Sequence, residues 1–335
     1  MRIKPESLDY KEKPWALWLT WEKQVRNRNL SLRLNAELVE IIEPGNRATR
    51  YVKSTVKSVA LLRRWYKKTV FVQNPSIVLA LIAVLLKRII RYTVVVDAHN
   101  AGIYPNKAKF ILAPLANFII RFADFVIVTN DALADRVSSV GGRPLVLPDP
   151  LPKDFDDLDS SAAIEKSASK KPQVLFICTW AQDEPYYEVI AAAGTLPNVQ
   201  FLITGSSKGR EKGYGKPIPN NVTLTGYVPD ADYHNLICTS DVIIDLTTRE
   251  DCLVCGAYEA VAARKPFILS DSIALKKYFR AGGLHVANES KPIAKAVEII
   301  LKDHEKFKAE VTVFKEALEK EWSEKLTQIL PLLHT

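Results

Sequence analysis

Short apolar runs typical of buried strands recur along the whole chain, and segments with helical periodicity separate them. Residues 48–67 and 107–123 have the clearest helical pattern in the first half. The predicted strands of that half are Ala16–Trp21, Glu37–Ile42, Thr69–Gln73, Tyr92–His99, Asp124–Asn130 and Pro144–Pro148. This alternation predicts a parallel sheet that helices cover on both faces.

The same alternation begins again after residues 148–172, which are rich in Pro, Ser and charge and predict an interdomain linker. The second series of predicted strands is Gln173–Trp180, Val199–Gly205, Val222–Val228, Asp241–Thr247, Pro266–Asp271 and Gly283–Asn288, with a largely helical tail from Lys291. A chain of 335 residues is also too long for one compact core. We therefore expect an α/β protein of two Rossmann-like, doubly wound domains that face each other across a cleft. Ligands of such sheets bind beyond the carboxyl ends of the strands, which directs attention to His99, Trp180, Gly205 and residues 247–271.

Positive charge is concentrated in the first half of the chain. Residues 1–150 hold 24 Lys and Arg against 12 Asp and Glu, or +12, and the remainder holds 22 against 26, or −4, which together give the net charge of +8. Residues 44–96 contain eleven Lys and Arg and no acid. Such a region, mixed with Trp65 and Tyr66, fits either an anionic membrane surface or an ordinary solvated basic face, and a nucleic acid is the least favoured partner.

The chain is expected to be soluble or peripheral on a membrane. Its longest apolar run, residues 76–86, is shorter than the roughly 20 residues of a membrane span. The N-terminus carries no signal-peptide pattern, and four cysteines without an export signal indicate a reducing compartment. We therefore predict a cytoplasmic location, at the cytoplasmic face of a membrane if the basic region binds lipid.

The stretch from Thr247 to Asp271 combines a C-x-x-C motif with acids and a glycine. Thiol or metal chemistry is disfavoured there, because Leu253 and Val254 between the cysteines supply no activating charge and Cys178 and Cys238 are isolated elsewhere. No metal site is expected.

The acids of this stretch make a better site. Residues 253–264 predict a helix whose first backbone N–H groups, from Leu253, Val254, Cys255 and Gly256, favour a diphosphate. Glu259, one turn further on, is suited to accept hydrogen bonds from two vicinal hydroxyls. The alternative is that Glu259 is a surface helix acid and that Asp251 is a helix cap.

An acid, seven residues, a glutamate and then AVAARKPFILSD resemble the E-x7-E region of GT-B glycosyltransferases of the family-four type. The likeness continues through residues 225–248 and to Trp322. It implies that Glu259 holds the donor ribose and that Asp251, or its neighbour Glu250, contacts the donor sugar. It also implies an N-terminal acceptor domain (1–165), a C-terminal nucleotide-sugar domain (166–310) and a helix (311–335) that packs back on the first domain.

A narrower resemblance is to the dolichol-pathway β-1,4-mannosyltransferases, through VFVQNPSIVLALI, VVVDAHN and FICTWAQDEPYYEVI. The last segment puts Trp180 at the donor site. The chain lacks the N-terminal anchor of those enzymes and the R-x4-K pair of many family-four enzymes. Lys208, Arg210 and Lys212, in the loop that follows Gly205, are therefore predicted to neutralise the diphosphate. The alternative is that this segment is an ordinary flexible loop.

These resemblances imply transfer of a hexose from a UDP- or GDP-sugar to an acceptor hydroxyl, without a metal or other cofactor. His99 or Asp97 is the candidate base if the reaction inverts configuration, as the second resemblance favours; in a retaining reaction His99 contacts the sugar. Without a catalytic role, His99 is a strand-end histidine. The predicted acceptor residues are Trp21, Glu22, Arg26, Arg28 and Asn100. The acceptor suggested by the arginines and the basic region is a lipid-linked pyrophosphate saccharide at an anionic membrane surface.

Other functions fit the same architecture. A nucleotide-sugar epimerase shares it, a phosphorylase-like or hydrolytic enzyme would release free sugar, and a non-catalytic adaptor would use only the basic domain on a membrane. The sequence does not identify the sugar, the base, the acceptor or the oligomeric state.

Overall fold

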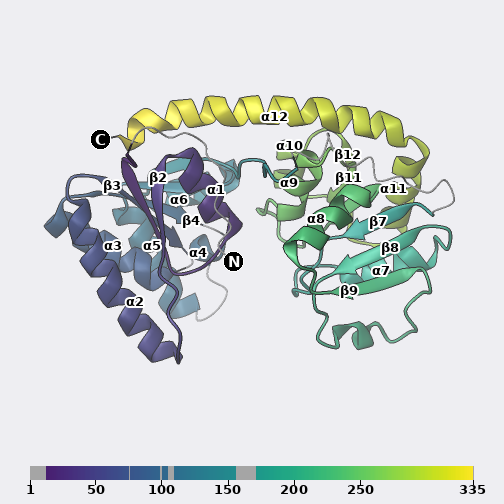
Figure 1. Cartoon of the computed structure of the whole chain (residues 1–335), viewed down its shortest axis with the longest axis horizontal. Helices are drawn as coiled ribbons and strands as arrows, with labels where there is room; N and C mark the ends of the chain where they lie inside the picture. The colour runs from purple at the N-terminus through teal and green to yellow at the C-terminus, as the bar shows by residue number, and fades with distance from the viewer. Residues whose placement is uncertain (1–12, 75, 99, 105–108, 156–170, 335) are drawn as a thin grey trace. The chain divides into compact units, whose positions relative to one another are not determined.

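The computed structural model describes residues 13–74, 76–98, 100–104, 109–155 and 171–334. The chain divides into two compact units, of which unit 1 comprises residues 1–149 and 322–335 and unit 2 comprises residues 150–321 (Figure 1). The boundary at 149/150 falls at the start of the predicted linker, whereas the predicted boundary at 165/166 lies outside the described residues. No helix within these described ranges is long and apolar enough to cross a bilayer.

Unit 1 is built on a six-stranded sheet in the order β2-β1-β3-β4-β5-β6, and every neighbouring pair is parallel. Its strands are β1 (Ala16–Thr20), β2 (Ala36–Glu40), β3 (Thr69–Asn74), β4 (Thr93–Ala98), β5 (Phe125–Val128) and β6 (Pro144–Val146). The central strands are buried on both faces, so their sequences are continuously apolar instead of alternating. All six strands predicted for this half are confirmed.

Two apolar clusters fix which helices cover which face of this sheet. The side chains of Leu17 and Leu19 join a cluster with α2 (Arg47–Leu62), α3 (Ile77–Ile90), α5 (Lys109–Phe122) and α6 (Asp131–Ser139). The intervening Trp18 joins Phe71 on the opposite face, where α1 (Val25–Arg33) and the last turns of α12 (His304–Leu333) pack. This alternation follows from the two-residue side-chain period of a strand.

Unit 2 repeats the plan with the strand order β12-β11-β10-β7-β8-β9, again with parallel neighbours. Its strands are β7 (Gln173–Phe176), β8 (Gln200–Thr204), β9 (Val222–Gly226), β10 (Val242–Asp245), β11 (Phe267–Ser270) and β12 (Gly283–Val286). One face packs against α7 (Tyr186–Gly194) and α11 (Ser290–Lys302). The other face packs against α8 (Asp230–Thr239), α9 (Cys255–Ala262), α10 (Ile273–Tyr278) and the first half of α12. The six strands predicted for this half are also confirmed.

Each sheet has one point where the direction of winding reverses. In unit 1 the reversal lies between β1 and β3, and in unit 2 it lies between β7 and β10. The loops that leave the two strands at such a point run to opposite faces of the sheet and leave a crevice at its carboxyl edge. Trp21 and Glu22 follow β1, and Trp180 and residues 250–259 follow β7 and β10, at these two points. Asp97 belongs to β4 and Gly205 follows β8, each one strand further along its sheet.

The C-terminal helix α12 contributes to the cores of both units. Val311, Phe314 and Leu318 belong to a core cluster of unit 2, and the segment from Trp322 onward belongs to unit 1. Trp322 is 6% exposed, and its indole N–H donates to the carbonyl of Pro148 at 2.9 Å. The guanidinium of Arg33 lies 5.5 Å from the centre of the indole ring. Residues 322–335, rather than the predicted 311–335, form the part of the helix that belongs to the first unit.

Replacing Trp322 by Ala is expected to destabilise unit 1 by about 3–5 kcal/mol, because the change leaves a large cavity beside Trp18 and Ile329. Trp322→Phe retains most of the apolar contact and loses the hydrogen bond to Pro148, so its cost should be smaller. Urea unfolding followed by circular dichroism measures both values. Equal costs for Ala and Phe would contradict this account of the packing.

Candidate active site

The candidate site of unit 2 lies at the carboxyl edge of its sheet, where β7 and β10 meet at the reversal of strand order. The loop after β7 contains Asp183 and Glu184, and the loop after β10 leads to α9, which carries Glu259. The two loops are joined directly. The hydroxyl of Thr247 donates to Asp183 at 3.1 Å, and a guanidinium nitrogen of Arg249 lies 3.0 Å from the same carboxylate.

Glu259 is half-buried, and the hydroxyl of Tyr233 on α8 donates to its carboxylate at 2.5 Å. Burial raises the pKa of Glu259 to about 7, against the lowering effect of the Tyr233 hydrogen bond and with a raising contribution from Asp154. The alternative that Glu259 is a solvated surface acid therefore does not fit. One carboxylate oxygen of Glu259 is therefore hydrogen-bonded to Tyr233. Because the pKa of Glu259 is near neutral, a ligand that hydrogen-bonds to the carboxylate would change its protonation state.

The first turn of α9 is hydrogen-bonded to an acid that the sequence pattern did not identify. Asp245, the last residue of β10, accepts a hydrogen bond from the backbone N–H of Gly256 at 2.7 Å. A Cβ on residue 256 would lie 2.6 Å from the same carboxylate oxygen, so a larger residue here would displace the Asp245 side chain. Burial raises the pKa of Asp245 well above its usual value, and the nearby charge of Glu259 raises it further, although the Gly256 hydrogen bond lowers it.

This arrangement changes the predicted anion site at the start of α9. The Gly256 N–H, predicted as a ligand of the diphosphate, is already satisfied by Asp245. The helix begins at Cys255, which is exposed, and its N-cap is Val254, which supplies no side-chain cap. Only N–H groups other than that of Gly256 are left to favour an anion. The sequence did contain a signal for Asp245, because this acid is the last residue of an otherwise apolar strand.

Glu250 and Asp251 lie in the turn between β10 and α9, where the resemblance put them. Glu250 is exposed, whereas Asp251 and Leu253 are half-buried. Because Val254 is the N-cap, the alternative that Asp251 caps the helix does not hold. All four cysteines lie in the described part of the chain and form no disulfide. Within that part, no group of three or more His, Cys, Asp and Glu side chains is placed to hold a metal ion.

The loop after β7 is organised by Glu184. Its carboxylate accepts hydrogen bonds from the backbone N–H groups of Thr179 and Ala181 and from the hydroxyl of Thr179, at 2.8–3.2 Å. Trp180, between them, has a positive φ of 61° and is fully buried, and its indole N–H donates to the carbonyl of Thr204 at 3.0 Å. A side chain with no exposed surface does not contact a ligand. The predicted donor-binding role of Trp180 is therefore replaced by a structural one.

Gly205 brings β8 close to the same loop. Its φ is +79°, and a Cβ there would lie 2.2 Å from the carbonyl oxygen of Cys178, so no other residue fits without displacing the backbone. The predicted cations Lys208, Arg210 and Lys212 follow on this edge and are exposed. The backbone there is held by Tyr187, whose hydroxyl donates to the carbonyl of Arg210 at 2.7 Å. Their binding of phosphate stays a prediction.

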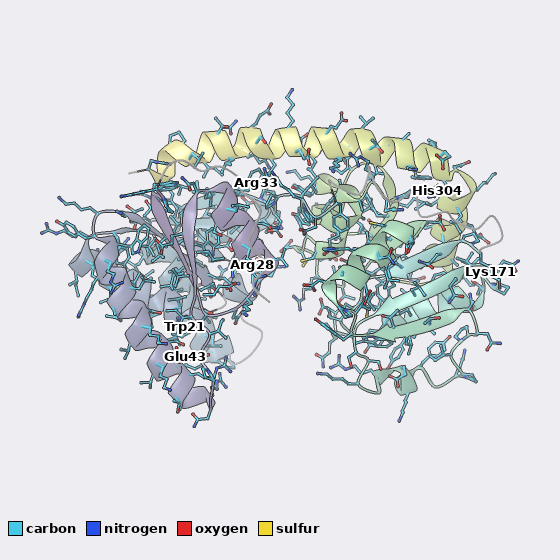
Figure 2. The ribbon with its side chains drawn as sticks, viewed as in Figure 1. Trp21, Arg28, Arg33, Glu43, Lys171 and His304 are labelled. Carbon is cyan, nitrogen blue, oxygen red and sulfur yellow. The ribbon has the colours of Figure 1, made fainter. Side chains whose placement is uncertain are left out.

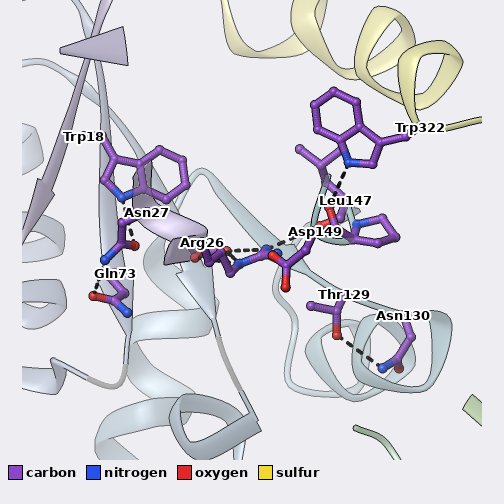
Figure 3. A network of polar contacts seen from close by, with 11 residues as sticks. Trp18, Arg26, Asn27, Gln73, Thr129, Asn130, Leu147, Asp149 and Trp322 are labelled. Carbon is purple, nitrogen blue, oxygen red and sulfur yellow. Dashed lines mark hydrogen bonds and ion pairs between the residues drawn. The ribbon is translucent and has the colours of Figure 1, made fainter. Parts of the chain in front are cut away.

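In unit 1, Arg26 pairs with Asp97 in the interior and with Asp149, which Figure 3 shows beside it. Asp97 is fully buried, and Arg26 donates to both of its carboxylate oxygens at 2.7–3.1 Å and also pairs with Asp149. Burial lowers the pKa of Arg26, but the two carboxylates outweigh it, so the guanidinium stays charged. This argues against Asp97 as the base and against Arg26 as a phosphate ligand, because both side chains are buried and are engaged in ion pairs within the protein. Their observed role is to tie α1 to β4 and to the end of β6.

Buried polar side chains surround the reversal point between β1 and β3. Asn27 accepts from the indole N–H of Trp18 at 3.1 Å and donates to Gln73 at 2.9 Å (Figure 3). Thr20 donates to the same Gln73 oxygen at 2.6 Å. Gln73 is fully buried, and its amide nitrogen has no hydrogen-bond acceptor among the residues that the structure describes. No sequence motif identified Asn27 or Thr20, because their meeting depends on the pairing of β1 with β3.

Trp21 and Glu22, predicted to bind the acceptor, line a small cavity of about 70 Å³ at this edge. Figure 2 labels two of the residues that line it, Trp21 and Glu43. The complete lining is Trp21, Glu22, Ile41, Glu43, Arg50, Tyr51, Ser54 and Ser76. The rings of Trp21 and Tyr51 meet edge to face at 5.7 Å. Arg28 is absent from this lining and faces Glu40 at 3.5 Å. Asn100 begins α4 (Asn100–Ile103), and His99 lies outside the described residues.

Comparisons with known proteins agree with this architecture. Residues 159–312 match the family model of glycosyl transferases group 1. HepE of Anabaena, solved with UDP and glucose, is 15% identical with a TM-score of 0.67 over 93% of this chain and 99% of its own. Sucrose-phosphate synthase of Thermosynechococcus elongatus is 18% identical with a TM-score of 0.69 over 89% and 84%. A glycosyltransferase of Rickettsia africae is 11% identical with a TM-score of 0.66 over 96% and 99%. No curated protein sequence matches the chain.

The predicted fold class is therefore confirmed: two parallel α/β sheets of the GT-B type. The resemblance to family-four-type glycosyltransferases is confirmed through the family model, which spans the segment that contains Glu259. The mannosyltransferase resemblance stays a prediction.

Glu259→Gln is expected to stabilise the free protein above pH 7 and to leave its stability at pH 4, below the ordinary pKa of 4.5, unchanged. The pKa of Glu259 is raised on folding, so its contribution is fully present at low pH and is lost as the pH rises through about 7. Glutamine mimics the protonated form at every pH. Thermal unfolding of both proteins across this range tests the sign, with the exposed helical Glu298→Gln as the matched control. A lower melting temperature for Glu259→Gln at pH 8 would overturn the assignment.

Proposed function

We propose that this protein transfers a hexose from a nucleotide-diphosphate sugar, most simply a UDP-sugar, to the hydroxyl of an acceptor. The observation that carries the proposal is Glu259, half-buried at the reversal point of unit 2 within the segment that matches glycosyl transferases group 1. HepE, which shares the fold, was solved with UDP and with UDP-glucose, which supports uridine as the base.

On the donor side, Glu259 is proposed to accept hydrogen bonds from the two ribose hydroxyls. Tyr233 occupies one carboxylate oxygen and fixes the orientation of the group, so the ribose is offered the remaining lone pairs. Binding of two hydroxyl donors favours the ionised form of Glu259. Donor affinity should therefore rise with pH through about 7 and then level off.

The diphosphate is proposed to lie between the start of α9 and the loop of Lys208, Arg210 and Lys212. Because Asp245 already binds the Gly256 N–H, the exposed cations carry more of the neutralisation than the helix does. This stabilisation of the leaving group requires no metal ion, in keeping with the family resemblance. Asp251, with Glu250 beside it, is proposed to contact the hydroxyls of the donor sugar.

The reaction breaks the bond between the anomeric carbon and the diphosphate oxygen, and the bonding electron pair leaves with the diphosphate. The acceptor oxygen forms the new bond to the anomeric carbon and gives up its proton. His99 is the proposed proton acceptor, since Asp97 is engaged by Arg26. Inversion of configuration stays a prediction, and the anomeric configuration of the product, determined by NMR, decides it.

On the acceptor side, the cavity of Trp21, Glu22 and Tyr51 is proposed to hold part of a saccharide. Two aromatic rings with a few carboxylate and hydroxyl groups are typical of a site for an amphipathic ligand. A volume of about 70 Å³ admits only a portion of a sugar ring. Arg50 in the lining suits a phosphate, which supports a lipid-linked saccharide as the acceptor.

The donor proposal predicts that UDP or a UDP-sugar raises the melting temperature of the wild type and not of Glu259→Ala. A ligand at 100 times its dissociation constant stabilises the native state by about 2.7 kcal/mol. Loss of two hydrogen bonds to a charged group should weaken binding on the order of a hundredfold or more. Thermal shift with UDP, GDP, ADP and their sugar conjugates provides the measurement.

Glu298→Ala, an exposed change on α11, is the control and should respond like the wild type. If no nucleotide shifts the wild type, unit 2 is not a nucleotide-sugar domain. If UDP-sugar binds but no acceptor is glycosylated and the donor is isomerised, the epimerase alternative replaces the transferase.

A further inference from the structure

Three neighbouring helices of unit 1 carry no acidic residue. They are α2, α3 and α5, which pack side by side on one face of the sheet. Solvated helices of globular proteins normally mix both signs of charge on their outer faces. The charged side chains that these three helices carry are all cationic, and Lys53, Arg88 and Arg121 among them are exposed.

Large apolar side chains are exposed on the same outer face. Ile89 is 77% exposed and Leu85 55% on α3, and Val56 is 63% exposed on α2. On α5, Phe118 and Phe122 lie one turn apart with ring centres 4.6 Å apart, and both are more than a third exposed. The inner faces of these helices already supply the core, so packing within unit 1 does not account for the outer apolar groups.

A cavity of about 270 Å³ opens where α3 and α5 end. Its charged lining is Lys87, Arg88, Arg121, Arg143 and Asp124. Lys87 pairs with Asp124 at 2.7 Å, whereas Arg88, Arg121 and Arg143 have no carboxylate partner within the described ranges. Four cations and one acid give a net charge of +3.

The dipoles of the two helices that end here explain only part of this positive charge. Cations in a last helical turn are favoured by the helix dipole, which accounts for Lys87, Arg88 and Arg121 in part. Arg143 comes from the segment before β6 and belongs to no helix. Two helix ends together supply about one negative charge, so roughly two positive charges are left for an anion.

We propose that the outer face of α2, α3 and α5 docks on an anionic bilayer and that a lipid phosphate enters the cavity between Arg88, Arg121 and Arg143. Interfacial surfaces combine cations for the headgroups with aliphatic and aromatic side chains that enter the acyl boundary. Phe122, which lines the cavity, and the exposed Leu85 and Ile89 on α3, the helix that carries Arg88, supply the apolar part. A nucleic acid would use the cations but gives no role to exposed Ile89 and Leu85. The proposal stands on observations separate from the donor site, and it would bring the chain to a lipid-linked acceptor.

Vesicle co-sedimentation of the full chain tests the proposal. The protein should bind vesicles of equal parts phosphatidylcholine and phosphatidylglycerol and should not bind phosphatidylcholine alone, and added salt should weaken the binding. Removing three charges with Arg88→Gln, Arg121→Gln and Arg143→Gln should weaken it roughly a hundredfold. Leu85→Ser with Ile89→Ser should weaken it while retaining the charge.

The matched control removes three exposed lysines of α11 in unit 2, with Lys291→Gln, Lys295→Gln and Lys302→Gln. This variant should bind vesicles like the wild type. Equal loss in the control, or unchanged binding in the three-arginine variant, would overturn the proposal. So would tight binding of duplex DNA that competes with vesicles and is unaffected by the two serine changes. The melting temperature of each variant reports its folding, and its shift with UDP separates a failure of membrane docking from a failure of the donor site.

Discussion

The hydrogen bond from the Gly256 amide to Asp245 is the interaction on which the candidate site depends. It joins the end of β10 to the first turn of α9 and thereby sets where Glu259, one turn later, lies. Glycine favours this close approach, because a Cβ would lie 2.6 Å from the Asp245 carboxylate and would displace it. The cost is a second carboxyl group buried near Glu259, and burial raises the pKa of both. A ligand that hydrogen-bonds to the ionised Glu259 offsets part of this cost, which is a physical reason for the proposed donor site to centre there.

Unit 1 has a comparable anchor with a different outcome. Arg26 is buried against Asp97 and Asp149, and a buried charge without a partner would be strongly destabilising. These ion pairs therefore hold three segments together, and neither Arg26 nor Asp97 is available to bind a substrate or to transfer a proton. The residues left at this edge for an acceptor are Trp21, Glu22 and the cavity that they line.

The surfaces of unit 1 divide by chemistry. Its carboxyl edge collects hydrogen-bonding groups such as Thr20, Asn27 and Gln73, because strand ends and loops meet there. Its helices α2, α3 and α5 carry cations and exposed apolar side chains and contain no acid. A sugar and a bilayer make opposite demands on a surface, so their separation on one unit is consistent with an enzyme that works on a membrane-bound acceptor.

The sequence by itself determined the twelve strands and their parallel arrangement, because strands buried on both faces are continuous apolar runs that helical segments separate. It also indicated Glu259, since the spacing from Asp251 in the turn to Glu259 on the following helix is local information. It extended several strands too far, as at Thr247 and Asn288, because polar residues that close a strand end through side-chain bonds do not mark where ladder pairing stops. Tertiary structure alone decided the direction in which strand-end side chains point. Trp180, Arg26 and Asp97 turn inward, and Asp245 and Tyr233 converge on Glu259, because those contacts join segments that only the order of strands in each sheet brings together.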